Sequence, residues 1–166
     1  MLIAMPPRID LSDFTCSVAR TLDVVGDKWT LLVLRDAFYG VRRFEDFTRD
    51  LGIARNVLTD RLGRLVEAGV LERRQYEERP PRFEYRLTAK GRELLPVVLA
   101  MMHWGDRWED PVGSGPVDLI HDDCGATTHA VSTCAGCGGA LTPFNVTVEP
   151  LPPVIAEVAQ ARAAAG

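Results

Sequence analysis

The hydrophobic residues between Gly52 and Ala68 recur with the spacing of an α-helix. Leu58, Leu62, Leu65 and Val66 form one stripe, which predicts a helix with one side packed against a core. The other side carries small and hydrogen-bonding side chains with arginines beside them. Such a helix can enter the major groove of DNA, where its front reads base edges and its flanks hold phosphates. The alternative is an ordinary amphipathic surface helix. The candidate DNA-contacting residues are Arg55, Asn56, Thr59, Asp60, Arg61 and Arg64.

The segment after this helix has the pattern of a two-stranded hairpin. Residues 70–76 predict a strand, and residues 83–87 alternate apolar and charged side chains, which is the period of a half-buried strand. The polar residues 77–82 between them include two prolines and form the loop. Helix, strand, loop and strand in this order predict a winged helix-turn-helix. Arg79 and Arg82 in this loop, the wing, are candidates for phosphate or minor-groove contact.

Two helices are predicted near the start of the chain. Residues 13–25 have apolar side chains at helical spacing, and Gly26 ends this helix. Asp27 can cap the N-terminus of the next helix. Residues 39–42 predict a turn or a short strand that can pair with the wing hairpin.

The first helix of the helix-turn-helix is predicted at residues 44–51, with Gly52 and Ile53 as its turn. Arg43 comes directly before this helix. A helix N-terminus attracts anions, so Arg43 is placed to meet a DNA phosphate there.

Residues 88–108 predict one long helix that is apolar on nearly every side, with Thr88 as its N-cap. A domain this small cannot cover both faces of such a helix, so we expect a second copy of the chain to cover one of them. A core helix in a monomer is the alternative. Pro96 is expected to bend this helix.

Four segments of the chain resemble the HxlR-type bacterial transcriptional regulators and occur in the order found in that family. The resemblance covers roughly residues 13 to 108. It implies a winged-helix homodimer that binds operator DNA. The sequence departs from the family pattern at the groove, where many relatives have Ser-Pro-Lys and this chain has Ala54-Arg55-Asn56. We therefore carry over no base preference. The segments are residues 16–35, 43–44, 57–62 and 80–88.

Composition is that of a soluble globular protein, with 46% hydrophobic and 25% charged residues. No apolar run is long enough to span a membrane, and we expect a cytoplasmic protein. The net charge of −4 argues against a nucleic-acid partner at first sight. Residues 41–92, however, hold thirteen of the nineteen basic residues and nine of the twenty-three acidic ones, a local charge of +4. The basic surplus therefore lies on the predicted DNA-binding unit.

Cys16 stands alone near the start of the first predicted helix. In the resembling family a cysteine at this place is common, and some members use it to sense oxidants or electrophiles. A helix N-terminus can lower the pKa of a thiol, which favours such sensing. The alternative is a small buried hydrophobic residue. A small molecule or an oxidant is therefore a candidate effector.

The other cysteines form a metal-ligand pattern. His121-x₂-Cys124 is followed by Cys134-x₂-Cys137, which is the layout of a zinc ribbon, and it predicts one structural zinc ion bound by these four residues. His129 is an alternative fourth ligand. A disulfide between Cys134 and Cys137 is the main competing interpretation, although a reducing cytoplasm disfavours it.

The predicted fold is α+β: a winged helix-turn-helix DNA-binding domain with flanking dimerisation helices, and a small C-terminal zinc-ribbon-like β unit. The sequence thus predicts a homodimeric transcriptional regulator, a repressor rather than an enzyme, on a pseudo-palindromic operator. A thiol-redox or protein-interaction module carried on the winged helix is the alternative. The predicted parts are an arm at 1–12, the DNA-binding and dimerisation domain at 13–109, a linker at 110–116, the ribbon at 117–150 and a flexible tail at 151–166.

Overall fold

The computed structural model describes residues 16–110 and 115–149. Its contacts divide the chain into two units, residues 1–129 and residues 130–166, and each unit is described by itself. The predicted arm, the first residues of the predicted helix at 13–25, most of the predicted linker and the predicted tail lie outside the described residues.

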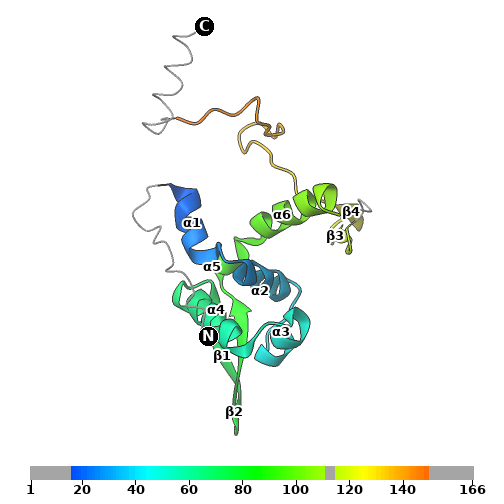
Figure 1. Ribbon diagram of the computed structural model, residues 1–166. Coiled ribbons are helices and arrows are strands. Elements are labelled where there is room, and N and C mark those ends of the chain that lie inside the picture. Colours follow the sequence, from blue (N-terminus) through cyan, green and yellow to red (C-terminus); the bar gives the residue numbers. More distant parts are fainter. Residues whose placement is uncertain (1–15, 111–114, 150–166) are drawn as a thin grey trace. The chain divides into compact units, whose positions relative to one another are not determined.

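The described part of the first unit follows the predicted order of a winged helix. Four helices precede the β1–β2 hairpin, which projects beyond them, and two further helices follow it (Figure 1). The elements are α1 (Ser17–Val25), α2 (Lys28–Phe38), α3 (Phe44–Leu51), α4 (Arg55–Glu67), β1 (Leu71–Glu78), β2 (Pro81–Leu87), α5 (Ala89–Arg92), α6 (Leu95–Trp108), β3 (Leu119–His121) and β4 (Ala126–Thr128).

The core lies between α2, α3, α4 and the start of β1. Leu58, Leu62 and Leu65 are buried there, which confirms the apolar stripe predicted for α4. They pack with Phe47 of α3 and Leu34 of α2 in one cluster. Burial of these side chains, at roughly 1.5–3 kcal/mol each, fixes how α4 is turned and therefore which of its residues face outward.

The helix ends follow the local chemistry that the sequence predicts. The Asp27 carboxylate accepts hydrogen bonds from the backbone N–H of Trp29 at 2.9 Å and of Thr30 at 3.3 Å, which confirms it as the cap of α2. Gly52 ends α3 in the left-handed conformation, with φ of +59°, and makes the turn of the helix-turn-helix. Ala54 precedes α4, and its side chain supplies no cap.

Helix α4 ends at a turn around Gly69, where two backbone hydrogen bonds run back into the helix. The N–H of Gly69 donates to the carbonyl of Val66 at 3.0 Å, and the N–H of Val70 donates to the carbonyl of Leu65 at 2.9 Å. This is a Schellman motif, in which the residue with positive φ is usually glycine. The motif turns the chain directly from α4 into β1.

The wing is tighter than the sequence predicts. The loop expected at residues 77–82 is reduced to a turn at Arg79 and Pro80, because the strands continue to Glu78 and resume at Pro81. Opposite charges across the hairpin favour this extension, since Arg82 lies opposite Glu77 and its Nε is 3.2 Å from the Glu77 carboxylate.

Residues 39 and 40 form a turn, which is one of the two alternatives predicted for residues 39–42, and Arg42 and Arg43 pair with the wing hairpin. Arg43 forms an isolated antiparallel bridge with Glu84, and the N–H of Tyr85 donates to the carbonyl of Arg42 at 2.7 Å. The segment before α3 therefore pairs with β2 of the wing hairpin, as the sequence predicts. The pairing ties the first helix of the helix-turn-helix to the base of the wing.

The prediction of a single helix at residues 88–108 is wrong, because the structure has two helices there. Thr88 does cap a helix, and its hydroxyl accepts from the N–H of Gly91 at 3.1 Å, but that helix is the short α5. Pro96 lies in the first turn of α6, where a proline is tolerated because the N–H that it lacks has no partner within the helix. The proline therefore begins a new helix instead of bending a continuous one.

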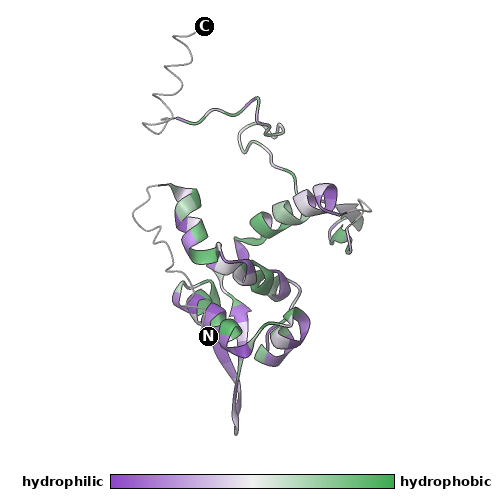
Figure 2. Cartoon of the chain, viewed as in Figure 1, coloured by the Kyte–Doolittle hydropathy of each residue, from purple (hydrophilic) through white to green (hydrophobic). Residues whose placement is uncertain are grey.

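Helix α6 is apolar and largely uncovered within this chain. Figure 2 shows hydrophobic residues in green along its first turns. Val98 is the one buried residue of α6 and is 8% exposed, whereas Met101, Trp104 and Trp108 are 50%, 57% and 64% exposed. None of the helices in the described part of the chain is long and apolar enough to cross a membrane.

Short β elements follow α6. In the first unit, β3 and β4 form an antiparallel hairpin in which Leu119 pairs with Thr128. In the second unit, an isolated bridge joins Thr133 to Ala140.

Candidate nucleic-acid interface

The exposed face of α4 is small and polar. Asn56, Thr59 and Gly63 all lie on this face, opposite the buried leucines. The Thr59 hydroxyl donates to the Arg55 carbonyl at 2.8 Å within the helix. Apart from its chain neighbours and the backbone of α4 itself, nothing in the described part of the chain lies within 4 Å of the place that a Cβ on Gly63 would occupy. The helix therefore presents a low, hydrogen-bonding front of the kind that fits against base edges.

Arg61 lies inside the domain, and not on the flank of α4 where the sequence analysis placed it. It is three residues from Leu58 and four from Leu65, so the helical spacing turns it toward the core, where it is 8% exposed. Its guanidinium is 2.9 Å from the Asp27 carboxylate and 2.7 Å from that of Asp60. We therefore leave Arg61 out of the proposed DNA contacts, and we assign it to holding α4 against the cap of α2.

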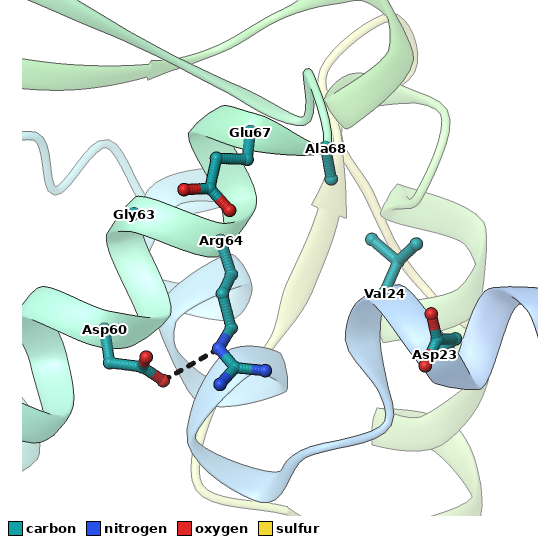
Figure 3. A pocket seen from close by; sticks show the side chains of 7 residues that line it. All are labelled: Asp23, Val24, Asp60, Gly63, Arg64, Glu67 and Ala68. Atoms are coloured by element: carbon teal, nitrogen blue, oxygen red, sulfur yellow. Dashed lines mark hydrogen bonds and ion pairs between the residues drawn. The ribbon is translucent and has the colours of Figure 1, made fainter. Parts of the chain in front are cut away.

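Asp60 and Arg64 form an ion pair on the surface of α4. The Arg64 Nε is 2.9 Å from the Asp60 carboxylate oxygen that Arg61 also binds. In Figure 3 the Arg64 side chain reaches along α4 toward Asp60, while Val24 and Asp23 come from α1 on the other side of a shallow hollow. Asp60 accepts from two arginines, which makes it a holder of Arg64 as well as a candidate contact in its own right.

Arg55 is held at the start of α4 by two residues of α3. Its two terminal nitrogens each lie 2.7 Å from one oxygen of Glu45. Its guanidinium carbon is 4.8 Å from the centre of the Phe44 ring. The ion pair holds the pKa of Glu45 below its ordinary value and raises the pKa of Arg55. Arg55 is therefore a charged and oriented side chain at the N-terminal end of α4. The N-terminal residues of a recognition helix are the ones that usually contact bases.

Arg43 and Arg82 lie between the start of α3 and the wing. Arg43 stacks over the Tyr76 ring at 4.7 Å, and together with Arg82 it lines a hollow between the start of α3 and the wing. Arg79 is exposed in the turn of the wing. Two of these arginines have aromatic or acidic partners, so the fold presents Arg43 and Arg82 in defined positions.

Glu45 and Tyr76 were not predicted from the sequence. Glu45 lies ten residues before Arg55, and only the packing of α3 against α4 brings the two together. Tyr76 falls at the irregularity in the register between Gln75 and Glu77, which regular alternation along the strand does not reveal. The acidic first turn of α3 was the one available signal for Glu45, since carboxylates favour a helix N-terminus.

Cys16 is exposed and immediately precedes α1. Hydrogen bonds from the backbone N–H groups of Ala19 and Val18 to the sulfur lower the pKa of Cys16, and the charge of Arg20 adds to this effect. A lowered pKa increases the thiolate fraction, which is the form that reacts with oxidants.

His121 and Cys124 form a tight turn in the first unit. The N–H of Gly125 donates to the His121 carbonyl at 2.7 Å, and Gly125 has φ of +69°. The Nδ1 atom of His121 lies 3.3 Å from the Cys124 sulfur. Gly125, directly after this ligand pair, therefore makes the turn.

Cys134 and Cys137 form a turn of the same kind in the second unit. The N–H of Gly138 donates to the Cys134 carbonyl at 2.8 Å, and Gly138 has φ of +73°. Hydrogen bonds from the N–H groups of Cys137 and Gly136, and from the Cys137 thiol, lower the pKa of Cys134. Both thiols are free. Among the residues that the structure describes, no three metal-ligating side chains lie together as a metal site.

Comparisons with known proteins agree with this arrangement. The model of the HxlR-like helix-turn-helix family matches residues 24–112. The HTH-type transcriptional regulator Rv3095 of Mycobacterium tuberculosis is 45% identical, over 86% of this chain and 90% of the relative. Among solved structures, PA1607, a proposed transcription factor, is 39% identical with a TM-score of 0.76, over 84% of this chain and 97% of its own.

The reduced form of the redox regulator HypR is also similar. It is 38% identical with a TM-score of 0.54, and the match covers 58% of this chain and 97% of the HypR chain. The winged helix, its exposed α4 and these matches agree, and the chain is therefore a helix-turn-helix transcriptional regulator that belongs to the HxlR family.

Proposed function

We propose that this regulator is a homodimeric repressor that binds a pseudo-palindromic operator in the cytoplasm. The observation that carries the proposal is the polar front of α4, which is exposed between two arginines that carboxylates hold in place. A two-fold dimer presents two such helices, so its operator has two related half-sites separated by one or more helical turns. A dimer seated over a promoter excludes other proteins from it, which gives repression.

The test is selection of duplexes from a random-sequence pool, followed by footprinting upstream of the protein's own gene. The expected result is one enriched motif with two-fold symmetry. Recovery of unrelated sequences at all salt concentrations contradicts sequence-specific regulation. A transcription assay on the selected site then separates repression from activation.

We further propose that oxidation of Cys16 lowers operator affinity. The supports are the exposed thiol with its lowered pKa and the similarity to HypR, which is described as a redox regulator. A bulky or charged adduct at the start of α1 would disturb the neighbouring packing. Peroxide should weaken the gel shift of the wild type and leave that of Cys16→Ser unchanged. An equal response by both proteins ends this proposal.

Structural zinc remains our proposal for the C-terminal cysteines and His121. Its support is that each ligand pair adopts a turn closed by a glycine with positive φ, and that backbone N–H groups of Gly136 and Cys137 bond the Cys134 sulfur. The lowered pKa of Cys134 favours a competing function, a thiol-redox pair with Cys137. Counting reactive thiols before and after a chelator distinguishes the two, because zinc protects thiols and a chelator releases them.

A further inference from the structure

Arg55 is fixed from two directions before any DNA is bound. The Glu45 carboxylate makes two hydrogen bonds of 2.7 Å to its terminal nitrogens, and the Phe44 ring lies beneath its guanidinium. A two-bond contact between an arginine and a carboxylate sets the plane of the guanidinium as well as its position. Arg55 and Glu45 are 63% and 68% exposed, so this oriented group lies at the surface and remains accessible.

The ion pair leaves part of Arg55 able to bind. A guanidinium has five N–H donors, and Glu45 takes two of them. The remaining donors include the Nε–H and point away from the carboxylate. The pair carries no net charge, and the Glu45 oxygens repel a nearby phosphate. A base edge with two acceptors, as guanine presents in the major groove, suits these donors better than the DNA backbone does.

We propose that Glu45 is a positioning residue for sequence recognition: it holds Arg55 so that the remaining N–H groups of Arg55 read a guanine edge. This inference rests on the proposed operator binding. It assigns a specificity role to α3, the helix of the pair that does not itself enter the groove. Because the side chain is already ordered, Arg55 loses less conformational entropy when it binds.

The chain offers a matched control in the next residue. Asp46 is also an acidic residue in the first turn of α3, but it pairs with Arg49 of the same helix and not with α4. Asp46→Ala and Glu45→Ala therefore remove the same charge from the same turn, and only Glu45→Ala releases Arg55. Both side chains are at least partly exposed, so neither change should unfold the domain, and a thermal melt checks this.

The experiment compares two probes: a duplex that the wild type selects from a random pool, and a shuffled duplex of the same composition. Both single changes should raise affinity for the shuffled duplex, because each removes a negative charge near DNA. Glu45→Ala alone should lower the ratio of selected to shuffled affinity, by roughly fivefold or more, the lower end for one bidentate base contact. Arg55→Ala should lower this ratio as well. The double variant Glu45→Ala with Arg55→Ala should lower the ratio little further than Arg55→Ala does.

Selection repeated with Glu45→Ala gives a second readout. One guanine position of the wild-type motif should become degenerate, whereas Asp46→Ala should select the wild-type motif. If Glu45→Ala and its control Asp46→Ala both raise the affinities for the selected and the shuffled duplex equally, Glu45 acts only through its charge and the inference is wrong. If the wild type selects no sequence at all, the proposed operator binding fails instead.

Discussion

Arg61 and Arg64 lie three residues apart on α4, and the fold places them in different surroundings. Arg61 is buried between Asp27 and Asp60, so it joins the cap of α2 to the recognition helix. Arg64 is 45% exposed and forms an ion pair with Asp60 at the surface. The same side chain is thus a structural link at one position and a surface donor at the other.

Loss of Arg61 should cost stability, because the Asp27 carboxylate then loses its guanidinium partner inside the domain, while Asp60 keeps its ion pair with Arg64. We expect Arg61→Met to lower the free energy of unfolding by about 1–3 kcal/mol, since hydrogen bonds to charged groups are worth about that much. Arg64→Met is the matched control and should change it by about 0.5 kcal/mol or less, as exposed substitutions do. Urea unfolding of both variants gives the comparison. Equal stability of the two would remove the structural role of Arg61.

Asp36 is a second buried charge, and it makes stability depend on pH. It is 1% exposed; Arg35 binds one oxygen, and the other has no hydrogen-bond partner within the described residues. Burial raises the pKa of Asp36; the Arg35 guanidinium opposes the rise, and the Asp50 carboxylate adds to it. The folded protein therefore binds this proton more tightly than the unfolded chain does.

The stabilisation from this proton is complete below the ordinary value of 3.8 and is lost as the pH rises through the higher folded pKa. Asp36→Asn removes the titration. The difference in unfolding free energy between the wild type and Asp36→Asn should therefore shift in favour of the wild type as the pH falls from 7 toward 4. A difference that stays constant over this range contradicts the raised pKa.

At the scale of elements, the face of α4 and its flanks should make separate contributions to binding. Asn56→Ala should cost roughly 1–3 kcal/mol on the selected duplex and little on a shuffled one, because amide groups read base edges. Arg64→Ala and Arg82→Ala should weaken binding to both duplexes and reduce the slope against salt concentration by about one, as expected for phosphate contacts. Fluorescence anisotropy at several salt concentrations measures both effects. If Asn56→Ala weakens both duplexes equally, the assignment of this face is wrong.

The elements of the winged helix follow from local chemistry, so the sequence predicts them closely. The bounds of α3 agree to the residue, and the Asp27 cap and the Gly52 turn are as expected. The boundary between α5 and α6 was missed, because a proline in a first turn and a proline inside a helix look alike in sequence. The spacing of Arg61 from Leu58 and Leu65 already placed it on the buried stripe, but its charge led to the prediction that it lies at the surface.

The pairings between elements could not be predicted. Glu45 with Arg55 and Arg61 with Asp27 join residues on different helices, and their contact depends on how those helices cross. Periodicity along one element gives the face of a residue but not the residue opposite it. The candidate site was therefore predictable as a set of arginines, and the carboxylates that orient them were not.

The small β elements after α6 bury little apolar surface, and this is why we expect them to bind a metal ion. The large apolar side chains in and around these elements are mostly exposed, including Ile120, Val131 and Phe144. A segment that buries so little cannot hold its fold through a hydrophobic core, so bound metal should supply the missing stability. We expect one zinc per chain by elemental analysis of protein purified without added metal. Cys134→Ser should lose it, and a chelator should disorder residues 117–150 while the helical signal of the winged helix persists. Fully reduced protein without zinc would favour the disulfide.

At the scale of the whole molecule, charge is distributed unevenly. The chain carries a net charge of −4, yet residues 41–92, which span α3, α4 and the wing, carry +4. Several of the basic groups in this region are paired with carboxylates, as Arg55 and Arg64 are. The attraction to phosphate is therefore moderate, and discrimination between sequences has to come from oriented contacts more than from total charge.

The uncovered face of α6 predicts that the protein assembles into a dimer. Met101 and Trp104 line a hydrophobic groove with Val97, and adjacent apolar residues of this size are seldom left in water on a monomer. A second copy that presents the same face would bury them around a two-fold axis. Sedimentation equilibrium at micromolar concentration should therefore give twice the chain mass of 18.3 kDa.

The double variant Met101→Glu with Trp104→Glu should be monomeric, because a dimer would bring four carboxylates together in an apolar interface. Tyr76→Glu is the control: it also adds a charge at a partly exposed aromatic residue, but on the wing, and it should remain dimeric. The monomer should bind each half-site alone and lose the gain that comes from linking two recognition helices. A monomeric wild type would remove both the dimer and the two-fold operator, whereas a double variant that stays dimeric would move the interface away from α6.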